Sequence, residues 1–126
     1  MIDVVEEFGF NAGRIWKALN EKGPLNEEQL LEETCLRNHE FFAAVGWLAR
    51  ENKIRRDGEM YVLDETNLTF EIGEDAGKIW NFLHPDMESD TEHLTRLIQK
   101  DESNIFSALG WLARENKIHL RKKDIN

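Results

Sequence analysis

Basic side chains gather in two short stretches of this 126-residue chain. Nine of the 16 lysines and arginines fall in two groups, Arg50, Lys53, Arg55 and Arg56 in the first and Arg114, Lys117, Arg121, Lys122 and Lys123 in the second. Clustered cations of this kind bind nucleic-acid phosphates, with an affinity that ignores base sequence and falls as salt is added. The alternative is a solvated charged surface that balances an acidic body, because the chain carries a formal charge of −9.

Side chains that could read bases are present in the first half of the chain. Arg37, Asn38 and His39 precede a helical apolar pattern, and arginine and asparagine are common readers of guanine and adenine. The matching place in the second half holds Asp101 and Glu102. Carboxylates are repelled by phosphates, so these two are expected to complement a helix dipole instead. Base reading is therefore predicted for the first half only.

Residue patterns for catalysis or metal binding are missing from the sequence. The four histidines show no ligand spacing with one another or with Cys35, the single cysteine. No glycine-rich loop carries the lysine and hydroxyl partner that cradles phosphate. We therefore expect a protein that is not an enzyme and needs neither cofactor nor metal.

One block of nine residues occurs twice in the chain. Residues 46–54, Gly-Trp-Leu-Ala-Arg-Glu-Asn-Lys-Ile, return as residues 110–118 at an offset of 64. The same offset places Ala-Gly-Arg-Ile-Trp at 12–16 on Ala-Gly-Lys-Ile-Trp at 76–80. Self-similarity at this spacing predicts two copies of one small domain, residues 1–64 (copy 1) and 65–126 (copy 2).

Three helices are predicted in each copy. The expected N-caps are Asn11 and Asp75 for the first helices and Asn26 and Asp90 for the second helices. The third helices are expected to span residues 38–52 and 103–116. Gly23-Pro24 and Pro85 are expected to end the first helices. Alternating apolar residues also predict a strand at Leu68, Phe70 and Ile72, and another at Ile2, Val4 and Phe8.

A β-hairpin is predicted after the third helix of copy 1. Asp57-Gly58 separates an extended segment that begins at Ile54 from the apolar run at 60–63, which is a strong turn signal. At the matching place of copy 2, Lys122 and Lys123 replace the turn residues. Copy 2 is therefore predicted to have a truncated wing.

Three helices followed by a hairpin is the order of a winged helix-turn-helix domain. The two repeated blocks resemble a bacterial winged helix-turn-helix family catalogued as a domain of unknown function, and the resemblance covers nearly all of each copy. It implies a mainly α fold with small β wings (α+β), built as tandem repeats. It implies no established activity.

The four tryptophans occupy equivalent places in the two copies. Trp16 and Trp80 follow the helical apolar stripe and are predicted to lie in the core. Trp47 and Trp111 point away from their stripe. They are either half-buried under the wing or the neighbouring copy, or exposed anchors for a partner protein, where tryptophan is enriched.

Two functions follow from these patterns. The first is a non-enzymatic regulator that binds DNA weakly through its third helices and basic wings. The alternative is a protein-interaction adaptor that uses the winged-helix scaffold without nucleic acid. Membrane binding is not expected, and the start of the chain lacks the features of a signal peptide, so a cytoplasmic protein is predicted. Monomer and homodimer both stay open.

Overall fold

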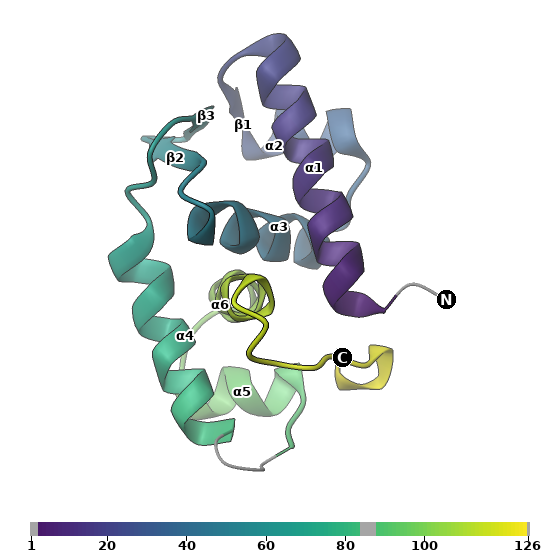
Figure 1. Cartoon of the computed structure of the whole chain (residues 1–126), viewed down its shortest axis with the longest axis vertical. Helices are drawn as coiled ribbons and strands as arrows, with labels where there is room; N and C mark the ends of the chain where they lie inside the picture. The colour runs from purple at the N-terminus through teal and green to yellow at the C-terminus, as the bar shows by residue number, and fades with distance from the viewer. Residues whose placement is uncertain (1–2, 84–87, 126) are drawn as a thin grey trace.

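The computed structural model describes residues 3–83 and 88–125. Within them the chain forms helices, a small antiparallel sheet and a 3-10 turn (Figure 1). In chain order the elements are α1 (Val4–Lys22), β1 (Leu25–Asn26), α2 (Glu27–Thr34), α3 (Asn38–Arg50), β2 (Ile54–Asp57), β3 (Met60–Leu63), α4 (Thr69–Leu83), α5 (Thr91–Ile98), α6 (Glu102–Arg114) and η1 (Lys122–Asp124). This is the predicted α+β class, with two winged-helix units in tandem.

The first helix of each copy is longer than predicted. Asp3 caps α1, and its side chain accepts a hydrogen bond from the Glu6 amide at 3.0 Å. The predicted caps Asn11 and Asp75 therefore lie inside α1 and α4, where both are buried. Pro85, the predicted end of the first helix in copy 2, lies outside the described residues.

The two strands predicted before these helices are wrong. Phe70 and Ile72 lie on α4, and Val4 and Phe8 lie on α1, whereas Ile2 is outside the described residues. Leu68, Ile72 and Ala76 also recur every four residues, and all are buried. A short apolar run fits both periods, and here the helical period continues further along the chain.

The second helices begin where their caps predict, whereas α3 begins at the predicted Asn38 and α6 begins at Glu102, one residue before its predicted start. Asn26 and Gln29 form a reciprocal capping box at α2, and the Asp90 side chain accepts from the His93 amide at 2.8 Å. The third helices end at Arg50 and Arg114, each about two residues before the predicted end. The starts of the second helices are set by local hydrogen bonds, which explains why sequence patterns locate them.

The sheet of copy 1 has the strand order β1-β3-β2, so β3 is its central strand. The predicted hairpin is present, but Asp57 pairs with Met60, so the turn residues are Gly58 and Glu59. β1, a two-residue strand in which Leu25 pairs with Tyr61, was not predicted. In copy 2 the described residues after Ile118 form no strand, and the chain turns through η1 instead.

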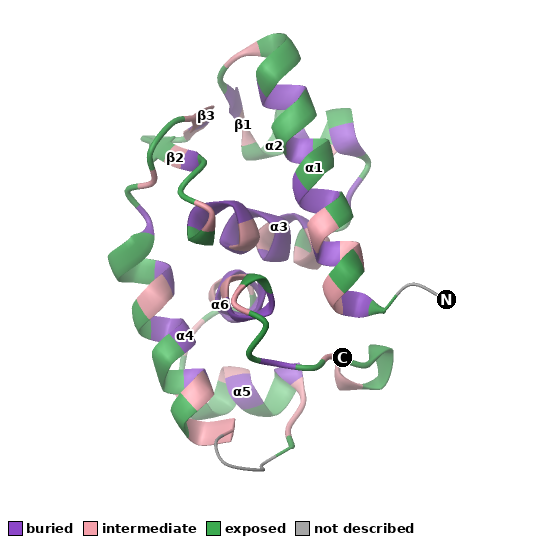
Figure 2. Cartoon of the chain, in the orientation of Figure 1, coloured by how far each residue is buried: buried purple, intermediate pink, exposed green. Residues whose placement is uncertain are grey.

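The described residues form two cores, each built mainly by one copy, and the two cores meet between α3 and α6 (Figure 2). The copies exchange residues, since Val4, Phe8 and Ala43 of copy 1 belong to the core of copy 2, and Leu68 and Ile72 of copy 2 belong to the core of copy 1. Ile15 and Ile79 are completely buried on α1 and α4. The prediction that Trp16 is a core residue is wrong, because 42% of it is exposed. Trp16 follows Ile15 directly, and one helical step turns a side chain about 100° away from the apolar stripe. Trp80 is half-buried, and Lys117 Nζ lies 5.3 Å from its ring centroid.

Tyr61 offers a clean test of the copy 1 core, because it is the only tyrosine in the chain. Its ring packs edge-on against Phe41, and burial raises the pKa of its phenol above 10.0. The folded state favours the neutral phenol. The stability that results is fully present below the pKa of the tyrosine in the unfolded state, and it is lost as the pH rises through its pKa in the folded state. We expect an ultraviolet titration midpoint above about 10. A midpoint at or below the free value would contradict this burial.

Candidate functional site: the seam between the third helices

The third helices of the two copies pack directly on each other, in the most extensive contact between any two described elements (Figure 1). A glycine of each helix lies against the backbone of the other. A Cβ atom added to Gly46 would lie 1.8 Å from the carbonyl oxygen of Ser107, and one added to Gly110 would lie 1.8 Å from that of Ala43. Because the offset maps Ala43 on Ser107, the contact is the same in both directions. We call this contact the seam.

The second residue of the repeated block fills the space beside the seam. The Trp47 ring lies against Gly9 of α1, and the Trp111 ring lies against Gly73 of α4. Each ring is also approached by an arginine of the other copy, with Arg114 5.8 Å from the Trp47 centroid and Arg50 5.7 Å from that of Trp111. Both tryptophans are half-buried, whereas an anchor for a partner protein would be largely exposed.

The same arginines form crossed ion pairs over the seam. Arg50 Nε lies 3.0 Å from Glu115 Oε2, and Arg114 Nε lies 3.0 Å from Glu51 Oε2. Lys53 and Lys117 lie 3.8 Å and 3.5 Å from the carboxylates of Glu51 and Glu115. Exposed pairs of this kind contribute little stability. They nevertheless pair four of the predicted phosphate-binding cations with carboxylates of the same chain.

The residues of the repeated block are therefore the residues that form the seam. Its glycine allows close approach, its tryptophan and arginine meet across the contact, and its glutamate pairs with the opposite arginine. Asn52 and Asn116 lie two residues after the ends of the third helices, each with φ of 59°, a left-handed conformation that asparagine tolerates. A surface that meets its own copy through a two-fold contact uses the same residues on both sides, which explains why the block is repeated.

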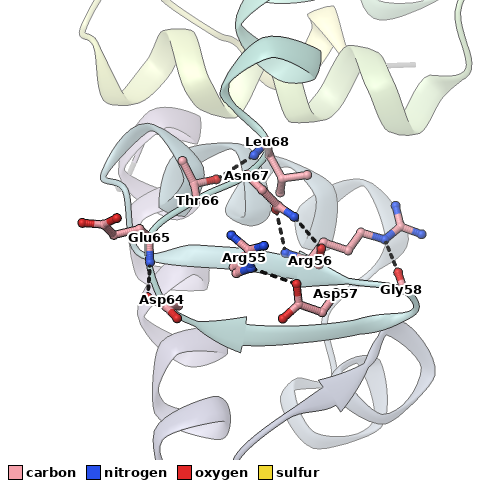
Figure 3. A network of polar contacts seen from close by, with 9 residues as sticks. All are labelled: Arg55, Arg56, Asp57, Gly58, Asp64, Glu65, Thr66, Asn67 and Leu68. Atoms are coloured by element: carbon pink, nitrogen blue, oxygen red, sulfur yellow. Dashed lines mark hydrogen bonds and ion pairs between the residues drawn. The ribbon is translucent and has the colours of Figure 1, made fainter.

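The two arginines of the copy 1 hairpin are bonded to neighbouring residues of the same hairpin (Figure 3). Arg55 Nε lies 2.8 Å from Asp57 Oδ1, and Arg56 Nε donates to the carbonyl of Gly58 at 3.2 Å. Asn67 fixes the Arg56 backbone by accepting from its amide at 2.9 Å and donating to its carbonyl at 2.7 Å. The Arg56 side chain remains exposed, and the Arg55 side chain is 41% exposed.

A cleft beside α1 brings together predicted residues of both copies. Arg37 and His39 of copy 1 line it with Lys122 of copy 2, and so do the carboxylates Glu7 and Glu40. His39 also packs on Phe106 of α6, with ring centroids 5.2 Å apart, while Asn38 is exposed. The cleft mixes both signs of charge, so it is not a uniformly basic groove.

The remaining cations at the end of copy 2 lie on η1 and just before it. Arg121 pairs with Asp124 at 3.1 Å and with Glu88 at 3.3 Å, and the Asp124 hydrogen bond raises the pKa of the arginine further. Lys122 and Lys123 are exposed. Arg56 faces a cavity between the hairpin, α4 and α6, whereas Lys122 faces the cleft beside α1. The structure therefore brings part of each basic group together at the seam, whereas Arg56 and Lys122 face different cavities.

Exposed aromatic residues were missed by the sequence patterns. Phe10 on α1 is 62% exposed and Phe70 on α4 is 82% exposed. The sequence signal was the position of each phenylalanine off its own apolar stripe. Among the described residues there is no group of three or more histidine, cysteine or acidic side chains that could hold a metal, and no helix there is long and apolar enough to cross a membrane.

Comparison with known proteins agrees with the repeat. The profile of a family described as "Winged helix-turn-helix domain (DUF2582)" matches residues 4–64 and again residues 63–126. The chain is also similar to the uncharacterized protein MJ1608 of Methanocaldococcus jannaschii, with 43% identity over 56 residues that span 42% of this chain and 79% of that protein. That relative is therefore about as long as one copy. No solved structure matches.

Proposed function

Because the chain belongs to the winged helix-turn-helix family DUF2582, we propose that it is a non-enzymatic regulatory module that acts by binding another protein. One observation carries this proposal. In a winged helix that reads DNA, the outer face of the third helix enters the major groove. Here the outer faces around Gly46 and Gly110 are buried against each other.

The charge of the chain also favours a protein partner over DNA. The chain has a formal charge of −9, so its average field repels a polyanion. Arg50 and Arg114 are engaged with carboxylates and tryptophan rings across the seam. Binding of these arginines to phosphate would break their contacts across the seam.

A second candidate is weak DNA binding by the hairpin of copy 1. The exposed side chain of Arg56 and the half-exposed side chain of Arg55 favour it. Such binding would neutralise few phosphates, so it would be insensitive to base sequence and readily weakened by salt. Arg37, Asn38 and His39 would then be the base readers in this candidate.

A titration of random-sequence duplex separates the two candidates. For a protein-binding module we expect no saturable binding below about 100 μM protein at about 50 mM salt, because non-specific DNA binders reach this range even at physiological salt. Fluorescence anisotropy of a labelled duplex is the measurement. The double variant Arg55→Ala and Arg56→Ala should change nothing.

Micromolar binding that weakens steeply with salt would overturn the protein-binding proposal. If the Arg55 and Arg56 variant then lowers the slope of log K against log salt by about one to two units, the hairpin makes the phosphate contacts. The variant Lys122→Ala and Lys123→Ala is the matched control, because it removes the same charge from copy 2.

A further inference from the structure

Copy 2 contains an apolar groove on the side away from the seam. Its volume is about 470 Å³. Its lining includes the aliphatic side chains of Leu83 on α4, Leu94 on α5, Leu109 on α6 and Ile118 after α6. Two stretches of backbone border it, Ser89 with Asp90 on one side and residues 118–121 on the other. In the described part of the chain neither stretch belongs to a strand.

The two backbone stretches that border the groove correspond to two strands of copy 1. The offset of 64 maps Ser89 and Asp90 on β1, and it maps residues 118–121 on β2. In copy 1 the strand between β1 and β2 is β3, which pairs with both. The offset maps the start of β3 on Asp124, which lies in η1 and lines the groove without forming a strand. By the offset, the groove of copy 2 therefore corresponds to the place of the central strand in copy 1. Asp90 and Arg121 already have extended backbone, with ψ of 171° and 152°.

The hydrogen-bonding direction of one border follows from copy 1. The Arg56 amide donates away from β3, to Asn67, so the alternate amides of Arg55 and Asp57 face β3. By the offset, the amides of His119 and Arg121 face the groove. The Arg121 amide donates to the Asp124 carboxylate at 3.2 Å, so a side chain takes the place of a strand carbonyl there.

We propose that an extended segment of a partner protein adds to copy 2 as its central strand, between Ser89–Asp90 and residues 118–121. The inference rests on the proposed protein-binding function and names its site. Strand addition supplies affinity through backbone hydrogen bonds and specificity through alternate side chains. The partner segment should carry apolar residues at alternate positions, as β3 does at Tyr61 and Leu63.

The exposed ion pair between Arg121 and Glu88 spans the rim of this groove at 3.3 Å. Exposed pairs contribute about 0–1 kcal/mol. An incoming strand can therefore displace this pair with little loss. The variant Glu88→Gln removes the pair without touching the apolar floor, so peptide affinity should stay the same or rise a few-fold.

The probe is a blocked peptide with the sequence of residues 59–64, Glu-Met-Tyr-Val-Leu-Asp, titrated into the whole chain and followed by amide NMR. We expect saturable binding with a dissociation constant below about 1 mM, the range of a weak complex. The shifts should centre on Ser89, Asp90, His119 and Leu120. The β1 residues Leu25 and Asn26 should not shift, because β3 already pairs with them.

Methylation of a peptide amide provides the matched control. The valine amide faces the β2 side in copy 1, because Val62 pairs with Arg55, whereas the leucine amide faces the other way. Methylating the valine amide should weaken binding about tenfold, the loss expected for one backbone hydrogen bond. Methylating the leucine amide should weaken it less. The protein variant His119→Pro should also weaken binding, since proline removes the donor that faces the groove.

Absence of saturable binding at about 1 mM peptide, or shifts confined to other surfaces, would overturn the strand site. Equal binding of both methylated peptides would also overturn it, because the groove would then accept side chains without backbone pairing. None of these results affects the duplex titration. Failure of the peptide together with absent DNA binding removes the strand site alone, whereas micromolar DNA binding removes the proposed function itself.

Discussion

Replacing Gly46 with alanine is expected to lower the free energy of unfolding by about 3 kcal/mol, near the upper end of the range for overpacking. The added Cβ would lie 1.8 Å from the Ser107 carbonyl oxygen, and this atom belongs to the backbone of α6. A side chain could rotate away, but a helix backbone cannot. The two helices must separate, which also loosens the crossed Arg50 and Arg114 pairs. A thermal melt should show a loss on the order of 10 °C.

Gly13 is the matched control, because it also lies inside a helix but has no atom within 4 Å of its added Cβ. Gly13→Ala should stabilise the protein by about 0.5–1 kcal/mol, since alanine loses less backbone entropy than glycine in a helix. Gly110→Ala should behave like Gly46→Ala, and Gly77→Ala like Gly13→Ala. Gly46→Ala melting at or above the wild-type temperature would show that the seam is not the tight contact described.

Local signals explain which parts of the fold were predictable. Asn26 and Asp90 start their helices through hydrogen bonds three residues away, and Gly58 forms its turn between adjacent strands. The strand predicted around Phe70 failed because a short apolar run fits both a strand and a helix. Trp16 was misplaced because a ring one position off the stripe points to solvent.

The seam was less predictable because its contacts join residues more than 60 positions apart. The sequence showed that Gly46 and Trp47 recur, but it did not show that the two blocks touch each other. Whether a cation such as Arg50 is available to phosphate depends on a carboxylate of the other copy, Glu115. Identity of all nine residues was the available signal, since a two-fold contact uses the same residues on both sides.

An ion pair with a buried carboxylate distinguishes copy 2 from copy 1. Asp75 on α4 is 1% exposed, and Lys100 Nζ lies 3.1 Å from its Oδ1 atom. That approach is poorly aligned, so Oδ1 accepts no hydrogen bond among the described residues, whereas Oδ2 accepts one from Lys100 at 3.4 Å. The offset places Asn11 and Leu36 at these positions in copy 1, and both are buried. The same scaffold therefore accepts either an ion pair or a neutral pair.

Lys100→Leu is expected to destabilise the protein by about 2–4 kcal/mol, because it leaves the Asp75 charge buried without a partner. The lower end allows for water, since 38% of the Lys100 side chain is exposed. The double variant Asp75→Asn and Lys100→Leu installs the copy 1 pair, so its stability should return to within about 1 kcal/mol of the wild type, the difference left by imperfect repacking. Denaturant unfolding of the wild type, both single variants and the double variant measures this coupling as a double-mutant cycle.

The reverse exchange in copy 1 is the control for this cycle. Asn11→Asp should be destabilising by itself, because Leu36 offers no charge to a buried carboxylate, and Leu36→Lys should restore part of the loss. A Lys100→Leu variant within about 0.5 kcal/mol of wild type, the range of ordinary surface changes, would mean that water reaches Asp75 freely. A double variant no more stable than Lys100→Leu would mean that the two copies have diverged in shape as well as in charge around these positions.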